Sequence, residues 1–120
     1  MSAGRLARQR GAGAEEAAAA FLARKGLDIL ARNYRCRLGE VDIVAREGEV
    51  LVFVEVRARS GDAFGGAAAS VDAHKQARLA AAARHFLGRL GAEPPCRFDV
   101  LAWDGPEGPP RWIRAAFELA

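Results

Sequence analysis

Apolar residues recur along the chain at two spacings, which predict two helices and five strands. Over residues 12–25 the apolar side chains repeat at helical intervals, which predicts a helix that ends at Gly26. A second apolar stripe predicts a helix over residues 72–90, with Ser70 or Asp72 as its N-cap.

β-branched runs predict the strands. The runs 40–46 and 50–57, separated by the short Glu47-Gly48 turn, are typical of a hairpin. Three further segments have the composition of strands: 28–36, 96–103 and 111–117. The resulting order α-β-β-β-α-β-β predicts the α/β class, a mixed central sheet with helices packed on it.

The segments outside this pattern define the expected organisation. Residues 1–11 are basic and aperiodic, so we expect a mobile arm before one domain spanning residues 12–120. Residues 60–70 are rich in glycine and lack periodicity, which predicts a loop that would act as a substrate gate.

Length and composition are consistent with one small domain. The chain has 120 residues and is 51% hydrophobic, but 27 of its residues are alanine, so the core is expected to be thin. No apolar run approaches the ~20 residues of a membrane span. Cys36 and Cys96 match no metal-binding pattern and are expected to be free thiols in a cytoplasmic protein without a membrane partner.

The net charge of the chain indicates less about its function than the distribution of charges along the sequence does. The formal charge of +3 favours nucleic acid only weakly, although 16 of the 18 cations are arginine. Residues 1–38 carry a net charge of +5, and the rest of the chain carries −2. The acidic part therefore contains the more informative charges.

Acidic side chains interrupt the predicted hairpin strands. Asp42 stands between Val41 and Ile43, and Glu55 follows five apolar residues. A buried carboxylate without a partner is costly. These acids therefore need a partner or a function.

The hairpin turn sets how these acids face each other. A turn centred between Glu47 and Gly48 would place Asp42 opposite Phe53. Four charged residues would then emerge on one side of the hairpin: Glu40, Asp42, Glu55 and Arg57.

In this register Asp42 lies diagonal to Glu55, at roughly 7–8 Å between backbones, so both carboxylates would reach one divalent cation such as Mg²⁺. The alternative is that the acids form ion pairs with Arg57, Arg59 or Lys75 on a solvated sheet face.

The run LARNYRCRLGEVDIVAREGEVLVFVEVRARSGDAFG, followed by SVDAHKQARL and CRFDVLA, resembles the YraN family of small bacterial proteins. The resemblance spans about residues 12–103. It implies a fold similar to that of restriction endonucleases and archaeal Holliday-junction resolvases. It also implies Mg²⁺, with Mn²⁺ as the alternative ion, bound by Glu15, Asp42 and Glu55.

Two residues would supply positive charge to such a site. Arg57 stands where the nuclease motif has lysine, and it remains protonated, so it cannot act as a base. Lys75 precedes Leu79 by one helical turn and would substitute for the missing lysine. The resemblance implies Glu15, Asp42, Glu55 and Arg57 as catalytic positions, and Lys75 is added to this set as the substitute lysine. A helix-end lysine that extends to solvent is the alternative for Lys75.

Further arginines would follow a nucleic-acid backbone: Arg35, Arg37, Arg57, Arg59 and Arg78. Scattered surface arginines are the alternative. Around the last hairpin, Trp112 is expected to pack internally, with the edge of a homodimer as the alternative.

Three functions follow. The first is a Mg²⁺-dependent endonuclease acting on DNA, including branched DNA. The second is a nucleic-acid-binding module that has lost catalysis. The third is a protein-interaction domain.

Overall fold

A computed structural model describes residues 3–58, 71–103 and 108–118, with side chains from residue 13 onward. The chain forms seven elements: α1 (Ala3–Arg24), β1 (Asp28–Cys36), β2 (Gly39–Glu47), β3 (Val50–Ala58), α2 (Ala73–Leu90), β4 (Cys96–Trp103) and β5 (Arg111–Phe117). This order confirms the predicted α/β class and the sequence α-β-β-β-α-β-β.

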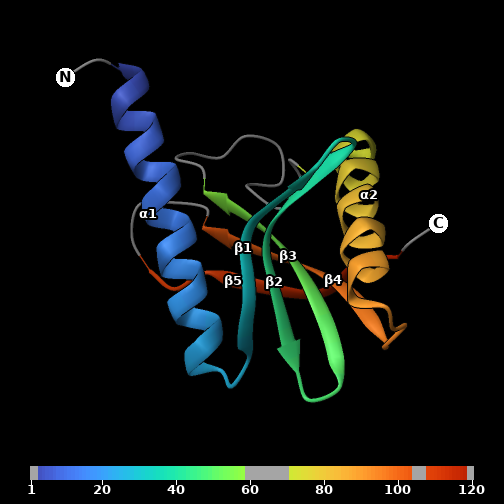
Figure 1. Ribbon diagram of the computed structural model, residues 1–120. Coiled ribbons are helices and arrows are strands. Elements are labelled where there is room, and N and C mark those ends of the chain that lie inside the picture. Colours follow the sequence, from blue (N-terminus) through green and yellow to red (C-terminus); the bar gives the residue numbers. More distant parts are fainter. Residues whose placement is uncertain (1–2, 59–70, 104–107, 119–120) are drawn as a thin grey trace.

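The five strands form one mixed sheet in the order β1-β2-β3-β4-β5. β2 is antiparallel to both β1 and β3, β4 is parallel to β3, and β5 is antiparallel to β4. The parallel pair needs a crossover connection, which α2 provides. Figure 1 shows α1 and α2 on opposite sides of the sheet.

Each face of the sheet has its own apolar core. Leu51 and Phe53 of β3 pack with Leu79 of α2 on one face. Val52 and Val54, the alternate residues of the same strand, pack on the other face with α1. β3 is therefore buried on both sides, and an acid in this strand has little access to water.

α1 begins at Ala3, so the helix starts nine residues before the expected start at residue 12. The segment 3–12 contains mainly alanine, arginine, leucine and glutamine, which favour helix, and its glycines do not end it. The expectation that residues 1–11 move stays a prediction. The expected gate at residues 60–70 lies outside the described residues.

The predicted hairpin register is wrong by two residues. Glu47 pairs with Val50, and Phe53 pairs with Val44 instead of Asp42. The turn is formed by Gly48 and the next residue, because Gly48 has φ +60, a left-handed conformation that tight hairpin turns require and glycine adopts readily.

The expected N-cap and C-terminal stop of α2 are confirmed. Asp72 caps α2 by accepting a hydrogen bond from the Lys75 amide, and Gly91 ends the helix at φ 71. Cys36 and Cys96 are free thiols. Among the described residues, no helix has the length and apolarity needed to cross a bilayer.

Gly39 allows α2 to lie close to the start of β2. A Cβ added at Gly39 would stand 1.9 Å from the carbonyl oxygen of Arg78. The absence of a side chain at Gly39 therefore allows the first turns of α2 to lie directly over β2.

We expect Gly39→Ala to destabilise the protein by about 2 kcal/mol or more, because main-chain atoms of α2 must move away from the new methyl group. Urea denaturation followed by circular dichroism measures the change. Gly88→Ala is the matched control: Gly88 is inside α2 with nothing within 4 Å of an added Cβ. The control should stabilise the helix by up to ~1 kcal/mol. Equal stability of the two variants would contradict the close approach.

Candidate functional site

Asp42 lies just beyond the end of the β2–β3 ladder. The paired residues end at Ile43 and Val54. Beyond this pair, the Val56 amide donates a hydrogen bond of 2.8 Å to Oδ2 of Asp42. The Asp42 side chain thus takes the place of a main-chain acceptor, which fixes its carboxylate between the two strands.

Glu55 of β3 lies next to Asp42 and is buried, with an exposed fraction of 3%. Burial, followed by the hydrogen bond and the charge of Asp42, raises the pKa of Glu55 to about 9. Burial and Asp42 therefore favour the protonated form of this carboxyl group, and the charges of Lys75 and Arg57 oppose it.

Glu15 completes a group of three acids on three elements. Its pKa is raised by partial burial and by the charge of Asp42, while a hydrogen bond from the Asn33 side chain opposes this rise. Asp42 thus interacts with both Glu15 and Glu55. These three acids are the ones that the resemblance implies as ligands, and their role as ligands stays a prediction.

Lys75 lies beside this group, as expected for the lysine substitute. Its Nζ is 2.9 Å from Oε1 of Glu40 and 3.3 Å from Oε2 of Glu55. The contact to Glu55 is an ion pair without hydrogen-bond geometry, because this oxygen has no hydrogen-bond partner within the described part of the chain. The expected ion pairs with Lys75 therefore exist, but Glu55 is not on a solvated face.

Arg57 is half-buried on β3, and its charge lowers the pKa of Glu55. Its Nε is buried and has no hydrogen-bond partner among residues whose placement is described. Arg57 and Lys75 thus both bring positive charge to Glu55.

Two polar residues that contact the site were not among the predicted site residues. Glu40 binds Lys75, and it was expected on the site's side of the hairpin but given no role. Asn33 has φ 51, a left-handed conformation that is uncommon outside glycine, and its side chain bonds Glu15. The signal available in the sequence was the interruption of the β1 pattern by this asparagine.

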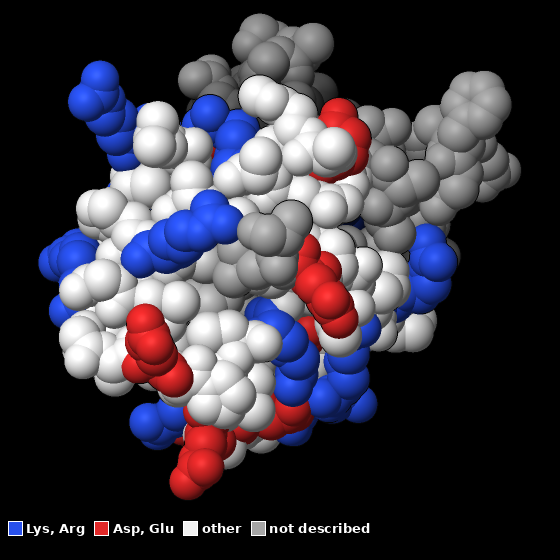
Figure 2. Space-filling view, turned by 90° about the vertical axis from the view of Figure 1, so that its right-hand side faces the viewer, with Lys and Arg blue, Asp and Glu red and all other residues white. Residues whose placement is uncertain are grey.

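The arginines expected to bind nucleic acid lie in different surroundings. Arg35 and Arg37 are exposed at the end of β1, and Arg78 forms an ion pair of 2.5 Å with Glu40. Arg59 lies outside the described residues. Figure 2 shows basic and acidic side chains interspersed on the face that it presents. That face carries no broad basic surface among the side chains it shows as described.

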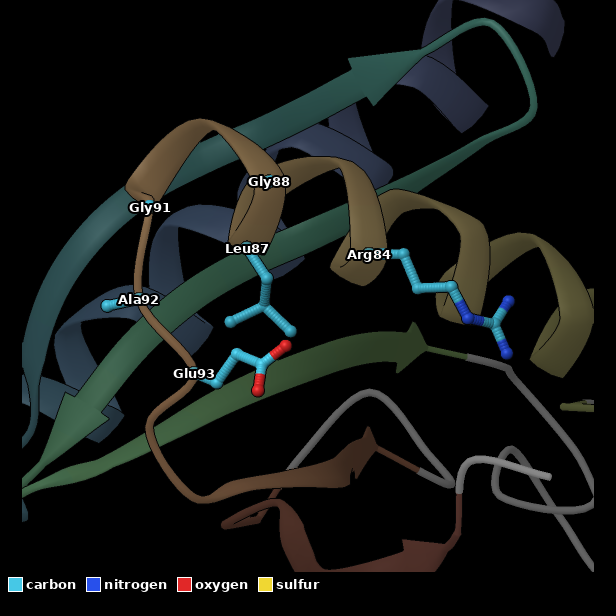
Figure 3. A pocket seen from close by; sticks show the side chains of 6 residues that line it. All are labelled: Arg84, Leu87, Gly88, Gly91, Ala92 and Glu93. Carbon is cyan, nitrogen blue, oxygen red and sulfur yellow. The ribbon is translucent and has the colours of Figure 1, made fainter.

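A surface hollow lies elsewhere, at the C-terminal end of α2. Its lining residues are Arg84, Leu87, Gly88, Gly91, Ala92 and Glu93. Figure 3 shows Leu87 and Glu93 pointing toward each other across it. It includes none of the three acids, and Lys75 is at the opposite end of the helix, so the hollow is separate from the carboxylate site.

The donors of the carboxylate site suit a hard divalent cation. Carboxylate oxygens are the ligands that Mg²⁺ prefers, and Oε2 of Glu55 is buried and receives no hydrogen bond from the described residues. Among the described residues, no group of three or more His, Cys, Asp or Glu side chains is arranged to hold a metal ion. The site therefore offers a carboxylate pair with Glu15 beside it, and not a complete protein cage.

The family model and the individual relatives that match this chain agree on one family. A family model described as uncharacterised protein family UPF0102 matches residues 14–103. A UPF0102 protein of Nitrosomonas europaea is 52% identical over 110 residues, which cover 91% of this chain and 93% of the relative.

Two further relatives differ in length. A UPF0102 protein of Cupriavidus taiwanensis is 54% identical over 112 residues, which cover 91% of this chain and 82% of the relative. One of Bordetella parapertussis is 56% identical over 112 residues, but the match covers 88% of this chain and 62% of that protein.

We expect the metal-free protein to lose stability as pH rises from about 5 to 9. Because the pKa of Glu55 is raised to about 9, the folded state keeps a proton that the unfolded state releases above its ordinary pKa near 4.5. One such proton gives a slope of up to about 1.4 kcal/mol per pH unit. Glu40 and Glu47 add no slope here, since arginine partners lower the pKa of each to about 2 and their effect falls below pH 4.5.

Chemical denaturation with EDTA at several pH values measures this slope. Glu55→Gln should be more stable than the parent at pH 8 by ~1 kcal/mol or more, with a smaller difference at pH 5. Glu49→Gln, at an exposed turn residue, is the control and should keep the parent's slope. A Glu55→Gln variant with an unchanged slope would contradict the assignment.

Proposed function

This chain belongs to the uncharacterised protein family UPF0102, and from that premise we propose that it is a metal-dependent hydrolase of DNA phosphodiester bonds. The resemblance to the YraN family noted in the sequence is thereby confirmed, since the two names denote one family. The family assigns no activity, so the proposal rests on the site.

One observation supports the proposal most strongly. Glu15 of α1 and Glu55 of β3 both interact with Asp42 of β2 at the end of the β2–β3 ladder, and the buried member, Glu55, is next to Lys75. Carboxylates whose pKa values are raised by burial and by each other occur preferentially at functional sites. A purely structural cluster would be expected to pair each buried acid fully.

Asp42 and Glu55 would hold the ion, with Glu15 reaching it from α1. Mg²⁺ is commonly bound by one or two carboxylates together with water and substrate phosphate, so a complete protein cage is not required. When bound, such an ion lowers the pKa of a water ligand and offsets the charge of the phosphate.

The remaining groups act through charge and position. Lys75 and Arg57 place two cations beside Glu55, where they would attract the phosphate that approaches the site. The Val56 amide holds Asp42 in a fixed orientation. Neither cation is assigned as the base.

A second candidate, binding of nucleic acid without cleavage, is favoured by a specific contact. The ammonium of Lys75 is already paired with Glu40 and Glu55. With Arg57 in place of the motif lysine, the site would then have no lysine free for chemistry. Cleavage assays separate the two candidates.

We expect cleavage of duplex, flapped or four-way DNA in Mg²⁺ or Mn²⁺, and loss of this activity by about 100-fold or more in Asp42→Asn and in Glu55→Gln. Gel assays at several salt concentrations measure rate and binding together. Glu49→Gln should cleave like the parent. Cleavage that survives both site substitutions would refute the metal site, while metal-independent binding without cleavage of any substrate would favour the second candidate.

We also expect Mg²⁺ to raise the melting temperature at pH 8 by a few degrees, because an ion that binds the folded state alone stabilises it. Differential scanning fluorimetry measures this, with NaCl matched for ionic strength as the control salt. The rise should vanish in Asp42→Asn and persist in Glu49→Gln. An equal rise in all three proteins would indicate metal binding elsewhere.

A further inference from the structure

Glu40 connects α2 to the carboxylate site through a chain of four ionisable side chains. Its carboxylate accepts hydrogen bonds from Nζ of Lys75 at 2.9 Å and from Nη2 of Arg78 at 2.5 Å. Nε of Arg78 adds a third bond at 3.2 Å, and Nζ of Lys75 continues to Oε2 of Glu55 at 3.3 Å. The order of contacts is therefore Arg78, Glu40, Lys75, Glu55.

The positions of these residues in α2 and β2 explain why their side chains meet. Lys75 and Arg78 are three residues apart on α2 and so share one face of the helix. Glu40 follows Gly39, whose missing side chain lets the main chain of Arg78 approach β2. Both partners of Glu40 are thus held at short range by the same contact between α2 and β2.

The three side chains nearest the site differ in how far they are exposed to water. The exposed fractions of the side chains are 29% for Glu40, 19% for Lys75 and 4% for Glu55. Lysine has a flexible stem and a strongly hydrated ammonium, and it ordinarily extends to water. Lys75 remains next to Glu55 because Glu40, stabilised by Arg78, provides its closest counter-charge.

We propose that Glu40 is a positioning residue, which holds the Lys75 ammonium at the Asp42–Glu55 pair where the scissile phosphate would bind. Its relevance to cleavage rests on the proposed function. Glu40 acts through Lys75 and is assigned no contact with the substrate. Arg78 is assigned here to Glu40, in place of the nucleic-acid backbone contact expected from the sequence.

The direction in which the loss of the Glu40 charge changes the reaction rate distinguishes a positioning role from a general electrostatic effect. Removing the negative charge of Glu40 should strengthen general attraction for a phosphate backbone, because one repulsive charge is lost. Loss of positioning should instead slow the reaction, since a displaced cation no longer stabilises the phosphate.

The placement of Lys75 is measured without any activity. The chain has two lysines, Lys25 and Lys75, so ¹⁵N-lysine labelling gives two side-chain ammonium groups, which Lys25→Arg assigns. We expect a slowly exchanging ammonium signal from Lys75 in the parent and in Glu49→Gln, and its loss in Glu40→Gln. Glu40→Asp, which keeps the charge but shortens the side chain, should shift the signal. An unchanged Lys75 signal in Glu40→Gln would overturn the positioning role.

The kinetic arm uses the same variants on the DNA substrate of the parent. We expect Glu40→Gln to lower kcat about 10-fold or more while KM stays equal or falls. A kcat equal to or above that of the parent would overturn the positioning role in cleavage. If the parent cleaves no DNA, the proposed function fails, and the ammonium signal still decides whether Glu40 holds Lys75.

Discussion

The burial of one carboxyl group, that of Glu55, governs the arrangement around it. β3 is packed on both faces, so Glu55 is shielded from water by the same cores that stabilise the sheet. A carboxylate in such a place must be protonated or compensated by charge. Asp42 favours the protonated form, whereas Lys75 and Arg57 favour the ionised form. The site is therefore balanced between two charge states.

Asp99 is another buried acid of this fold, and its partners do not favour opposite charge states. It is 1% exposed, and its carboxylate accepts hydrogen bonds from Arg97, from the Trp112 indole and from the Ala115 amide. These contacts tie β4 to β5 where β5 departs from regular pairing, and Ala115 has φ 49 there. A buried acid whose carboxylate is fully hydrogen-bonded in this way contributes to the fold itself. The contrast singles out Glu55 as the acid that stability alone does not explain.

Regular elements were predictable from the sequence because periodicity reports burial directly. The strands and the second helix follow their apolar patterns, and the stripe that contains Leu79 places Lys75 toward the sheet. Pairing depends on a turn only two residues long, so placing it one residue early changed the whole register. The hydrogen bond of Asp42 with Val56 and the contacts of Glu40 with α2 join segments distant in sequence, which no local pattern encodes.

The parallel pairing of β3 with β4 bears on the order in which the chain assembles. β1, β2 and β3 are joined by short turns, so their contacts are local in sequence and close with little loss of chain entropy. β4 pairs with β3 across the crossover that includes α2, which is a long-range closure. Asp42 and Glu55 therefore belong to the part of the sheet formed by local contacts, whereas Lys75 reaches them only through the long-range crossover. The docking of α2 on the sheet is thus what supplies these acids with the counter-charge of Lys75.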